Sequence, residues 1–141
     1  MNRLKVGLIH NEPIPKGEPN WESSADVLAQ VEAIEAALNE LGQPHVRIPF
    51  TRDLAAFVAR VRKEKITVAF NLCESVDEDP LLIGHPAAVL ELLGIPFTGS
   101  SAMALLLSTD KLTVKTLLTA SGLRTPAFFL YEGNEVRRPA E

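Results

Sequence analysis

Short apolar runs alternate with longer stretches of helical periodicity along the first hundred residues of this 141-residue chain. Four runs are expected to form strands, at residues 4–9, 44–49, 66–72 and 95–98. Between them, apolar residues recur at intervals of three and four, which is typical of helices that bury one face. This alternation predicts an α/β fold, with a parallel sheet of about four strands, right-handed crossovers and flanking helices.

A long loop rich in proline, glycine and asparagine is expected between the first strand and the first helix, at residues 10–20. Residues 23–26 offer candidate N-caps for that helix, and Gly42 is suited to end it. Ligands of parallel sheets collect at the carboxyl ends of the strands. We therefore expect any binding site to be formed by this loop, the loop at 73–80 and the turn at 99–101.

The composition is that of an ordinary folded protein, with 46% hydrophobic residues, 23% charged residues and a net charge of −4. It argues against intrinsic disorder and against a basic nucleic-acid-binding face. No apolar stretch approaches the length of a membrane span, and the first apolar run is too short for a signal peptide. A single cysteine excludes an intramolecular disulfide and fits a reducing compartment. We expect a cytoplasmic protein with neither nucleic acid nor membrane as a partner.

The chain lacks the common phosphate-binding motifs. Neither G-x-G-x-x-G nor the P-loop pattern follows the first strand, where the sequence reads His-Asn-Glu-Pro. This argues against a small Rossmann-like nucleotide-binding domain of another class. The three histidines, His10, His45 and His85, have no paired metal-ligand spacing. His10 and His85 flank the expected ligand side and stay open as ligand contacts, whereas His45 is expected to be a polar surface residue.

The loop after the third expected strand carries two features with alternative interpretations. Cys73 is either a buried packing residue or, with a base nearby, a nucleophile. Four carboxylates follow it: Glu74, Asp77, Glu78 and Asp79. They form either a solvated loop or a site that recognises a positively charged group such as a substrate ammonium.

Residues 90–101 read L-E-L-L-G-I-P-F-T-G-S-S, and they are followed by Asp110-Lys111 and by G-L-R-T-P at 122–126. In order and spacing, these pieces resemble the D-alanine–D-alanine ligase family of the ATP-grasp superfamily. In that family, L-E-L-L-G-I-P-[YF]-T-G-S precedes a D-K pair and a helix that ends in G-[IVL]-x-x-P. The motifs cover the C-terminal half of the chain, and the N-terminal half agrees in its pattern of strands and helices.

The resemblance implies a Rossmann-like pre-ATP-grasp domain at residues 1–101. Residues 102–141 would form linker helices and the beginning of a truncated ATP-grasp, ATP-binding domain. The parent protein would be a cytoplasmic, dimeric, ADP-forming carboxylate–amine ligase of cell wall (peptidoglycan) biogenesis, which forms an acyl phosphate and uses ATP and Mg²⁺. In the family, the second ATP lysine, the glycine-rich loop and the metal ligands lie later in the sequence. We therefore expect this chain alone to contain no catalytic residue and no metal ligand, to bind no cofactor tightly and to be inactive as a ligase.

Individual residues take their expected roles from the same resemblance. Lys111 matches the family lysine that contacts the ATP phosphate and adenine region, and a lysine that opens a helix offers a movable charge to an anion. Glu22 and Ser23 are the nearest equivalents of the glutamate and serine that meet the first amino-acid substrate. Glu78 falls near the acidic residue of the family's loop after the third strand.

Two departures leave the substrate and the function open. The first loop is not glycine-rich, and Cys73-Glu74 replaces the family's His-Gly. A ligase that joins a different carboxylate to a different amine is one alternative, and a non-catalytic α/β binding or assembly domain is another. Residues 128–130, Phe-Phe-Leu, are expected to need a partner strand, so we also expect a homo-oligomer.

Overall fold

The computed structural model describes residues 4–18, 21–133 and 135–137. The side chains at positions 23, 24, 132 and 135–137 lie outside this description. The chain divides into two compact units, Met1–Thr109 and Asp110–Glu141.

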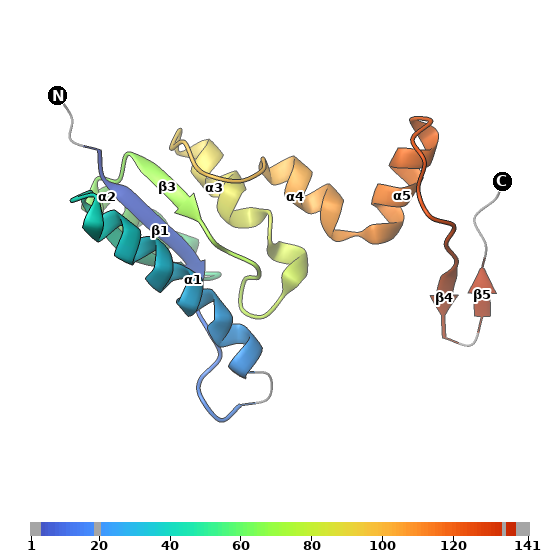
Figure 1. The fold of residues 1–141 in the computed structure, drawn as a ribbon, viewed down its shortest axis with the longest axis horizontal. Coiled ribbons are helices and arrows are strands. Elements are labelled where there is room, and N and C mark those ends of the chain that lie inside the picture. The colour runs from blue at the N-terminus through green and yellow to red at the C-terminus, as the bar shows by residue number, and fades with distance from the viewer. Residues whose placement is uncertain (1–3, 19–20, 134, 138–141) are drawn as a thin grey trace. The chain divides into compact units, whose positions relative to one another are not determined.

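The first unit is an α/β domain built on parallel strands. Its elements are β1 (Val6–Asn11), α1 (Trp21–Glu40), β2 (His45–Phe50), α2 (Leu54–Glu64), β3 (Val68–Asn71), η1 (Pro80–Leu82), α3 (His85–Leu92) and α4 (Ala102–Thr109). Among the described residues, the sheet has three strands in the order β2-β1-β3, and β1 pairs in parallel with both neighbours (Figure 1). The predicted α/β class and parallel sheet are confirmed.

The fourth expected strand is reduced to a single parallel bridge between Phe97 and Ala69. Ala69 N donates to Pro96 O at 2.9 Å, and Thr98 N donates to Ala69 O at 3.0 Å. Residues 95–98 therefore lie beside β3 in the expected position and direction. The ladder stays short because Pro96 has no N–H to contribute.

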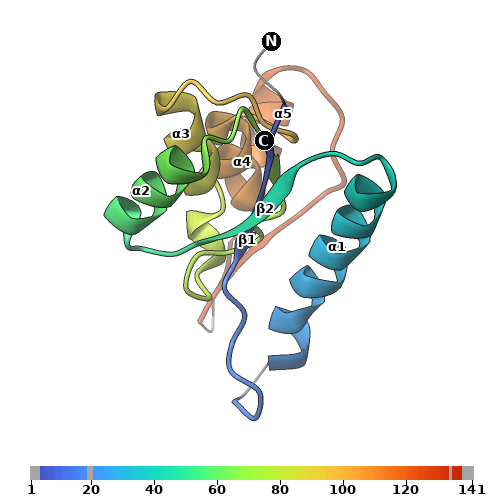
Figure 2. The same cartoon turned by 90° about the vertical axis from the view of Figure 1, so that its left-hand side faces the viewer.

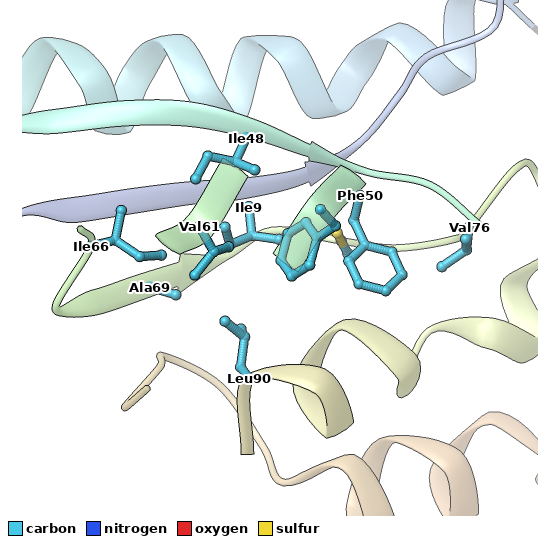
Figure 3. Packing of buried hydrophobic residues seen from close by; sticks show 10 residues of the cluster. Ile9, Ile48, Phe50, Val61, Ile66, Ala69, Val76 and Leu90 are labelled. Atoms are coloured by element: carbon cyan, nitrogen blue, oxygen red, sulfur yellow. The ribbon is translucent and has the colours of Figure 1, made fainter. Parts of the chain in front are cut away.

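Two layers of helices cover the sheet (Figure 2). On one face, buried side chains of the strands pack against α2 and α3, and Phe50 meets Phe57 edge-on at 4.7 Å between ring centroids (Figure 3). The paired residues Ile9 and Ile48 lie in the same cluster. On the other face, Leu8 packs with Val31 of α1. β1 is buried along its whole length, which explains its continuous apolar sequence.

The boundaries of α1 correct one prediction and confirm another. The helix begins at Trp21, so residues 23–26 lie inside its first turns and cannot cap it. Gly42 has φ 61°, and Gln43 N donates to Leu38 O at 2.8 Å across the end of the helix. The expected role of Gly42 as the helix terminator is confirmed, because this left-handed conformation is unfavourable for other residues.

The second unit contains α5 (Lys111–Ala120) and an antiparallel pair, β4 (Leu130–Glu132) with β5 (Glu135–Arg137). Of residues 128–130, which were expected to need a partner strand, Leu130 belongs to β4 and pairs with β5, whereas the two phenylalanines precede the strand. In the first unit, α4 packs against α3 and η1. The domain boundary expected at residue 101 stays a prediction of the family resemblance. No helix among the described residues is both long enough and apolar enough to cross a membrane.

Candidate functional site

The carboxyl ends of the parallel strands form one edge of the first unit. β1 and β3 end there with Asn11 and Asn71, and the loops that leave them start at the same edge (Figure 1). We call this edge the rim, defined by Asn11, Asn71 and the loop at residues 72–79. Leu72 N donates to Ile9 O at 2.7 Å, which holds the beginning of the β3 loop against β1.

Two asparagine side chains fix the backbone of that loop. Asn11 Oδ1 accepts a hydrogen bond from Glu74 N, and Asn71 Oδ1 accepts one from Cys73 N, both at 3.3 Å. Because each partner is an N–H donor, each amide turns its oxygen toward the loop and its Nδ2 elsewhere. Asn11 is 5% exposed and is one of the few buried polar residues.

The side chain of Glu74 is held by a third element. Gln30 of α1 donates from Nε2 to Glu74 Oε1 at 2.9 Å. Glu74 thus lies where β1, α1 and the β3 loop meet, although 44 and 63 residues separate it from Gln30 and Asn11. Its other carboxylate oxygen, Oε2, has no partner in the described part of the chain.

The acidic loop is a tight turn clamped by Arg52. Val76 and Asp79 exchange two backbone hydrogen bonds of 3.2 and 3.0 Å, and Asp77 and Glu78 between them have φ 46° and 66°. Arg52, which follows β2, lies 3.3 Å from Asp77 and 3.6 Å from Asp79. Two of the four carboxylates are therefore neutralised internally, whereas the exposed Glu78 at the tip has no partner within the described residues.

Cys73 lies buried beside this loop, in the apolar cluster with Val76 and Leu90. Burial raises the pKa of the Cys73 thiol far above its usual range. The thiol is therefore protonated at neutral pH, and a nucleophile requires the thiolate. Of the two interpretations, the structure favours the packing residue.

The three histidines lie in different surroundings. His10, 7% exposed, precedes Asn11 of the rim and donates from Nδ1 to Asn11 O at 2.9 Å. His85, exposed at the start of α3, donates to Leu82 O at 3.1 Å. His45 opens β2 at the opposite end of the sheet, 3.6 Å from Glu35. Among the described residues, no three histidine, cysteine or acidic side chains converge on a possible metal site.

The predicted substrate residues lie on different elements. Glu22 is exposed in the first turn of α1, and Ser23 follows it, although its side chain lies outside the described residues. Glu78 is at the tip of the turn. Glu22 and Glu78 do not contact each other, and the expected roles of Glu22, Ser23 and Glu78 in substrate binding stay predictions. The sequence analysis did not identify four residues that hold the loop at 72–79 in place: Asn11, Gln30, Asn71 and Arg52. Only the position of the two asparagines at the ends of strands could have indicated them.

Lys111 opens α5, as expected, and its side chain is exposed. Asp110 caps the helix and accepts a hydrogen bond from Leu112 N at 3.0 Å. Hydrogen bonds from Thr113 Oγ1 and Leu112 N lower the pKa of Asp110. Because this carboxylate already occupies the helix terminus, an anion there would meet the mobile ammonium of Lys111 rather than a cradle of free N–H groups. The ATP-binding role of Lys111 stays a prediction of the family resemblance.

Lys115, one turn further along α5, is committed to the fold of the second unit. Its Nζ donates to Thr125 Oγ1 at 3.0 Å and to Pro126 O at 3.1 Å, and it lies 5.0 Å from the centre of the Phe128 ring. Lys115 therefore ties the G-L-R-T-P segment to α5. Of the two lysines on this helix, only Lys111 is left with an ammonium that has no partner in the described residues.

The fold and the rim define an α/β domain that would present a ligand at the ends of parallel strands. No family model matches the chain. The chain is 30% identical over 132 residues to the D-alanine–D-alanine ligase of Moorella thermoacetica, covering 94% of this chain and 38% of that protein. It is 36% identical over 133 residues to the ligase of Pelotomaculum thermopropionicum, covering 94% of this chain and 37% of the relative. An uncharacterized protein of Sinorhizobium fredii, y4sG, is 41% identical over 134 residues, which are 90% of this chain and 38% of that protein.

A solved structure shows the same fold. The D-alanine–D-alanine ligase of Bacillus anthracis, crystallised with ATP, superposes with a TM-score of 0.53 at 19% identity, over 94% of this chain and 41% of that one. The chain is homologous to the N-terminal region of D-alanine–D-alanine ligases and spans less than half of their length.

Proposed function

We propose that this chain is the substrate-facing N-terminal part of an ATP-dependent carboxylate–amine ligase. The observation that carries the proposal is the homology to D-alanine–D-alanine ligases along 94% of the chain. The rim supports it, since carboxylate and amide groups gather where parallel sheets bind ligands. The reaction would form ADP and an acyl phosphate that an amine attacks, in the cytoplasm, where ATP is available.

The nucleotide side of the proposal rests on Lys111. ATP, when bound with Mg²⁺, would supply the phosphoryl group that activates the carboxylate. Lys111 would contribute a point charge near a phosphate, while Asp110 fixes the start of its helix. The roles of Glu22, Ser23 and Glu78 toward a substrate are part of the same proposal.

An ADP-release assay tests this function directly. The 141-residue chain and any longer reading frame that contains it would be supplied with ATP, Mg²⁺ and D-alanine, then with other amino acids. We expect no turnover from the 141 residues alone and amino-acid-dependent ADP release from the longer protein. Amino-acid binding without ADP release by the longer protein would instead support the non-catalytic binding domain.

Nucleotide binding is tested by titrating ATP and Mg²⁺ into the chain while following the backbone amides by NMR. We expect weak shifts around Lys111 that are lost in Lys111→Gln. Lys63→Gln is the control, because Lys63 is an exposed lysine in the last turn of α2. We also propose self-association into a homodimer, which the family resemblance implies. Light scattering tests it, and a monodisperse monomer would contradict it.

A further inference from the structure

We infer that Asp110 is a positioning residue that keeps α4 and α5 as two helices and thereby places Lys111 at the start of a helix. α4 ends at Thr109 and α5 begins at Lys111, so Asp110 is the single residue that joins them. Its backbone is extended, with φ −90° and ψ 106°. The boundary between the two compact units lies between Thr109 and Asp110. The consequence for ATP rests on the proposed role of Lys111, whereas the break between the helices does not.

The sequence across this break contains no residue that forces a helix to end. Residues 102–120 include neither proline nor glycine, and most of them are alanine, leucine, methionine or lysine, which favour helices. Local propensity alone would therefore let α4 continue into α5. Because it does not, side-chain hydrogen bonds have to account for the break.

Two hydroxyl groups at the end of α4 do not account for it. Ser108 Oγ and Thr109 Oγ1 donate to Leu105 O at 3.1 and 2.8 Å. These bonds reach back three and four residues, as those of serine and threonine do inside continuous helices. They are therefore compatible with a helix that runs on past Thr109.

The hydrogen bonds of Asp110 are incompatible with a continuous helix. Its Oδ1 accepts from Leu112 N at 3.0 Å, and its Oδ2 accepts from Thr113 Oγ1. In a continuous helix, Leu112 N would donate to Ser108 O instead. The carboxylate of Asp110 thus replaces a helical hydrogen bond, and it does so from an exposed position. A smaller residue there would remove the cap without leaving a cavity.

The break decides what surrounds the side chain of Lys111. Side chains on a helix lean toward its N-terminus, so a lysine at the first position can extend its ammonium beyond the start of the helix. In a continuous helix, the preceding turn would fill that space, and Leu107, four residues earlier, would lie beside Lys111. Asp110 would therefore affect the binding of an anion to Lys111 without touching the anion.

Backbone NMR of the 141-residue chain with substitutions at Asp110 tests the inference. Asp110→Ala should give helical chemical shifts at residue 110 and a nuclear Overhauser contact between Thr109 Hα and the Leu112 N–H. The population of the continuous helix should rise about fivefold, as is typical of a lost N-cap. Asp110→Asn keeps a capping oxygen and should keep the break. Asp110→Glu keeps the charge but is not a preferred N-cap, and it should behave as Asp110→Ala does.

Asp53→Ala is the matched control. Asp53 caps α2 in the same way, by accepting from Ala56 N at 2.9 Å. The element before it is the strand β2, so no helix precedes α2 that could join it. Asp53→Ala should therefore lose stability without giving helical shifts at residues 51–53.

A titration with ATP and Mg²⁺ measures the consequence for Lys111. Asp110→Ala and Asp110→Asn remove the same negative charge, so a difference between them reports the cap and not the charge. We expect the Kd of Asp110→Ala to be about fivefold higher than that of Asp110→Asn, because only alanine lets the helix continue. Asp53→Ala should bind as the natural chain does.

The inference is overturned if Asp110→Ala keeps the natural shifts at residues 109–111, or if Asp110→Asn loses the break as alanine does. If Asp110→Ala fails to fold, Thr113→Ala, which removes only the partner of Oδ2, should show part of the same change. Unchanged shifts in that variant would equally overturn the inference.

The proposed nucleotide role of Lys111 stands or falls separately. If Asp110→Ala forms the continuous helix and neither the natural chain nor any variant binds ATP, the role of Asp110 is right and that of Lys111 fails. If the break persists in Asp110→Ala while ATP binding is lost in Lys111→Gln, only the role of Asp110 is wrong.

Discussion

Glu35 of α1 and Arg47 of β2 form a doubly hydrogen-bonded ion pair that fastens the helix to the outer strand of the sheet. Arg47 Nε donates to Glu35 Oε1 at 3.1 Å, and Nη2 donates to Oε2. His45 lies 3.6 Å from the same carboxylate. The hydrogen bonds from Arg47 hold the pKa of Glu35 below its ordinary value. The contribution of this ion pair to the free energy of unfolding therefore depends on pH.

Glu35→Gln should lower the free energy of unfolding by about 0.5–1 kcal/mol at pH 7, because the pair is partly exposed and screened. A carboxylate whose pKa is lower in the folded chain stabilises the fold above its unfolded pKa. That contribution is lost as the pH falls through the folded pKa. Urea unfolding at pH 7 and at about pH 3 should therefore show a difference between the two proteins only at pH 7. Glu40→Gln is the control, and an undiminished difference in acid would contradict the assignment.

The sequence predicted the layers of this fold because they depend on local periodicity. Val31 of α1 and Ile9 of β1 lie in the core, as the spacing of apolar residues indicates. The contacts of the rim could not be predicted from the sequence, because Asn11 and Glu74 meet only after β1 and β3 have paired. The predicted start of α1 was wrong. Polar residues at 23–26 suit a cap, but the helix already begins at Trp21.

Cys73 should react slowly with thiol reagents in the folded chain. Burial raises the pKa of its thiol, so both access and ionisation oppose alkylation. Iodoacetamide at pH 8 should modify the native protein at least about tenfold more slowly than the urea-unfolded chain, followed by mass spectrometry. Equal rates would show that the thiol is accessible and ionisable and would reopen its role as a nucleophile.

Gly84→Ala should destabilise the first unit by about 1–3 kcal/mol, the usual range for overpacking. A Cβ at position 84 would lie 2.5 Å from Leu106 Cγ and 3.0 Å from Ala102 O, so α3 and α4 would have to separate. Its φ is ordinary, at −78°, and space is the only obstacle. Thermal unfolding of Gly84→Ala, with and without Leu106→Ala, measures the loss of stability. Leu106→Ala should relieve part of that loss, because it removes the side chain that the new Cβ would meet.

Gly94→Ala is the matched control for that experiment. A Cβ there meets nothing within 4 Å, but the backbone has φ 66°. Its cost should be about 1–2 kcal/mol from backbone strain alone, and Leu106→Ala should not relieve it. Equal relief at both positions would mean that Leu106 acts through general loosening of the domain rather than through contact with position 84.

Glu78→Gly should stabilise the fold by about 0.5–1 kcal/mol, because a non-glycine residue at φ 66° is strained and glycine is not. Urea unfolding measures the change. Glu12→Gly, in the exposed loop after β1, is the control and should be neutral or slightly destabilising, since glycine there only adds freedom to the unfolded chain. A loss of stability in Glu78→Gly would contradict the strain argument.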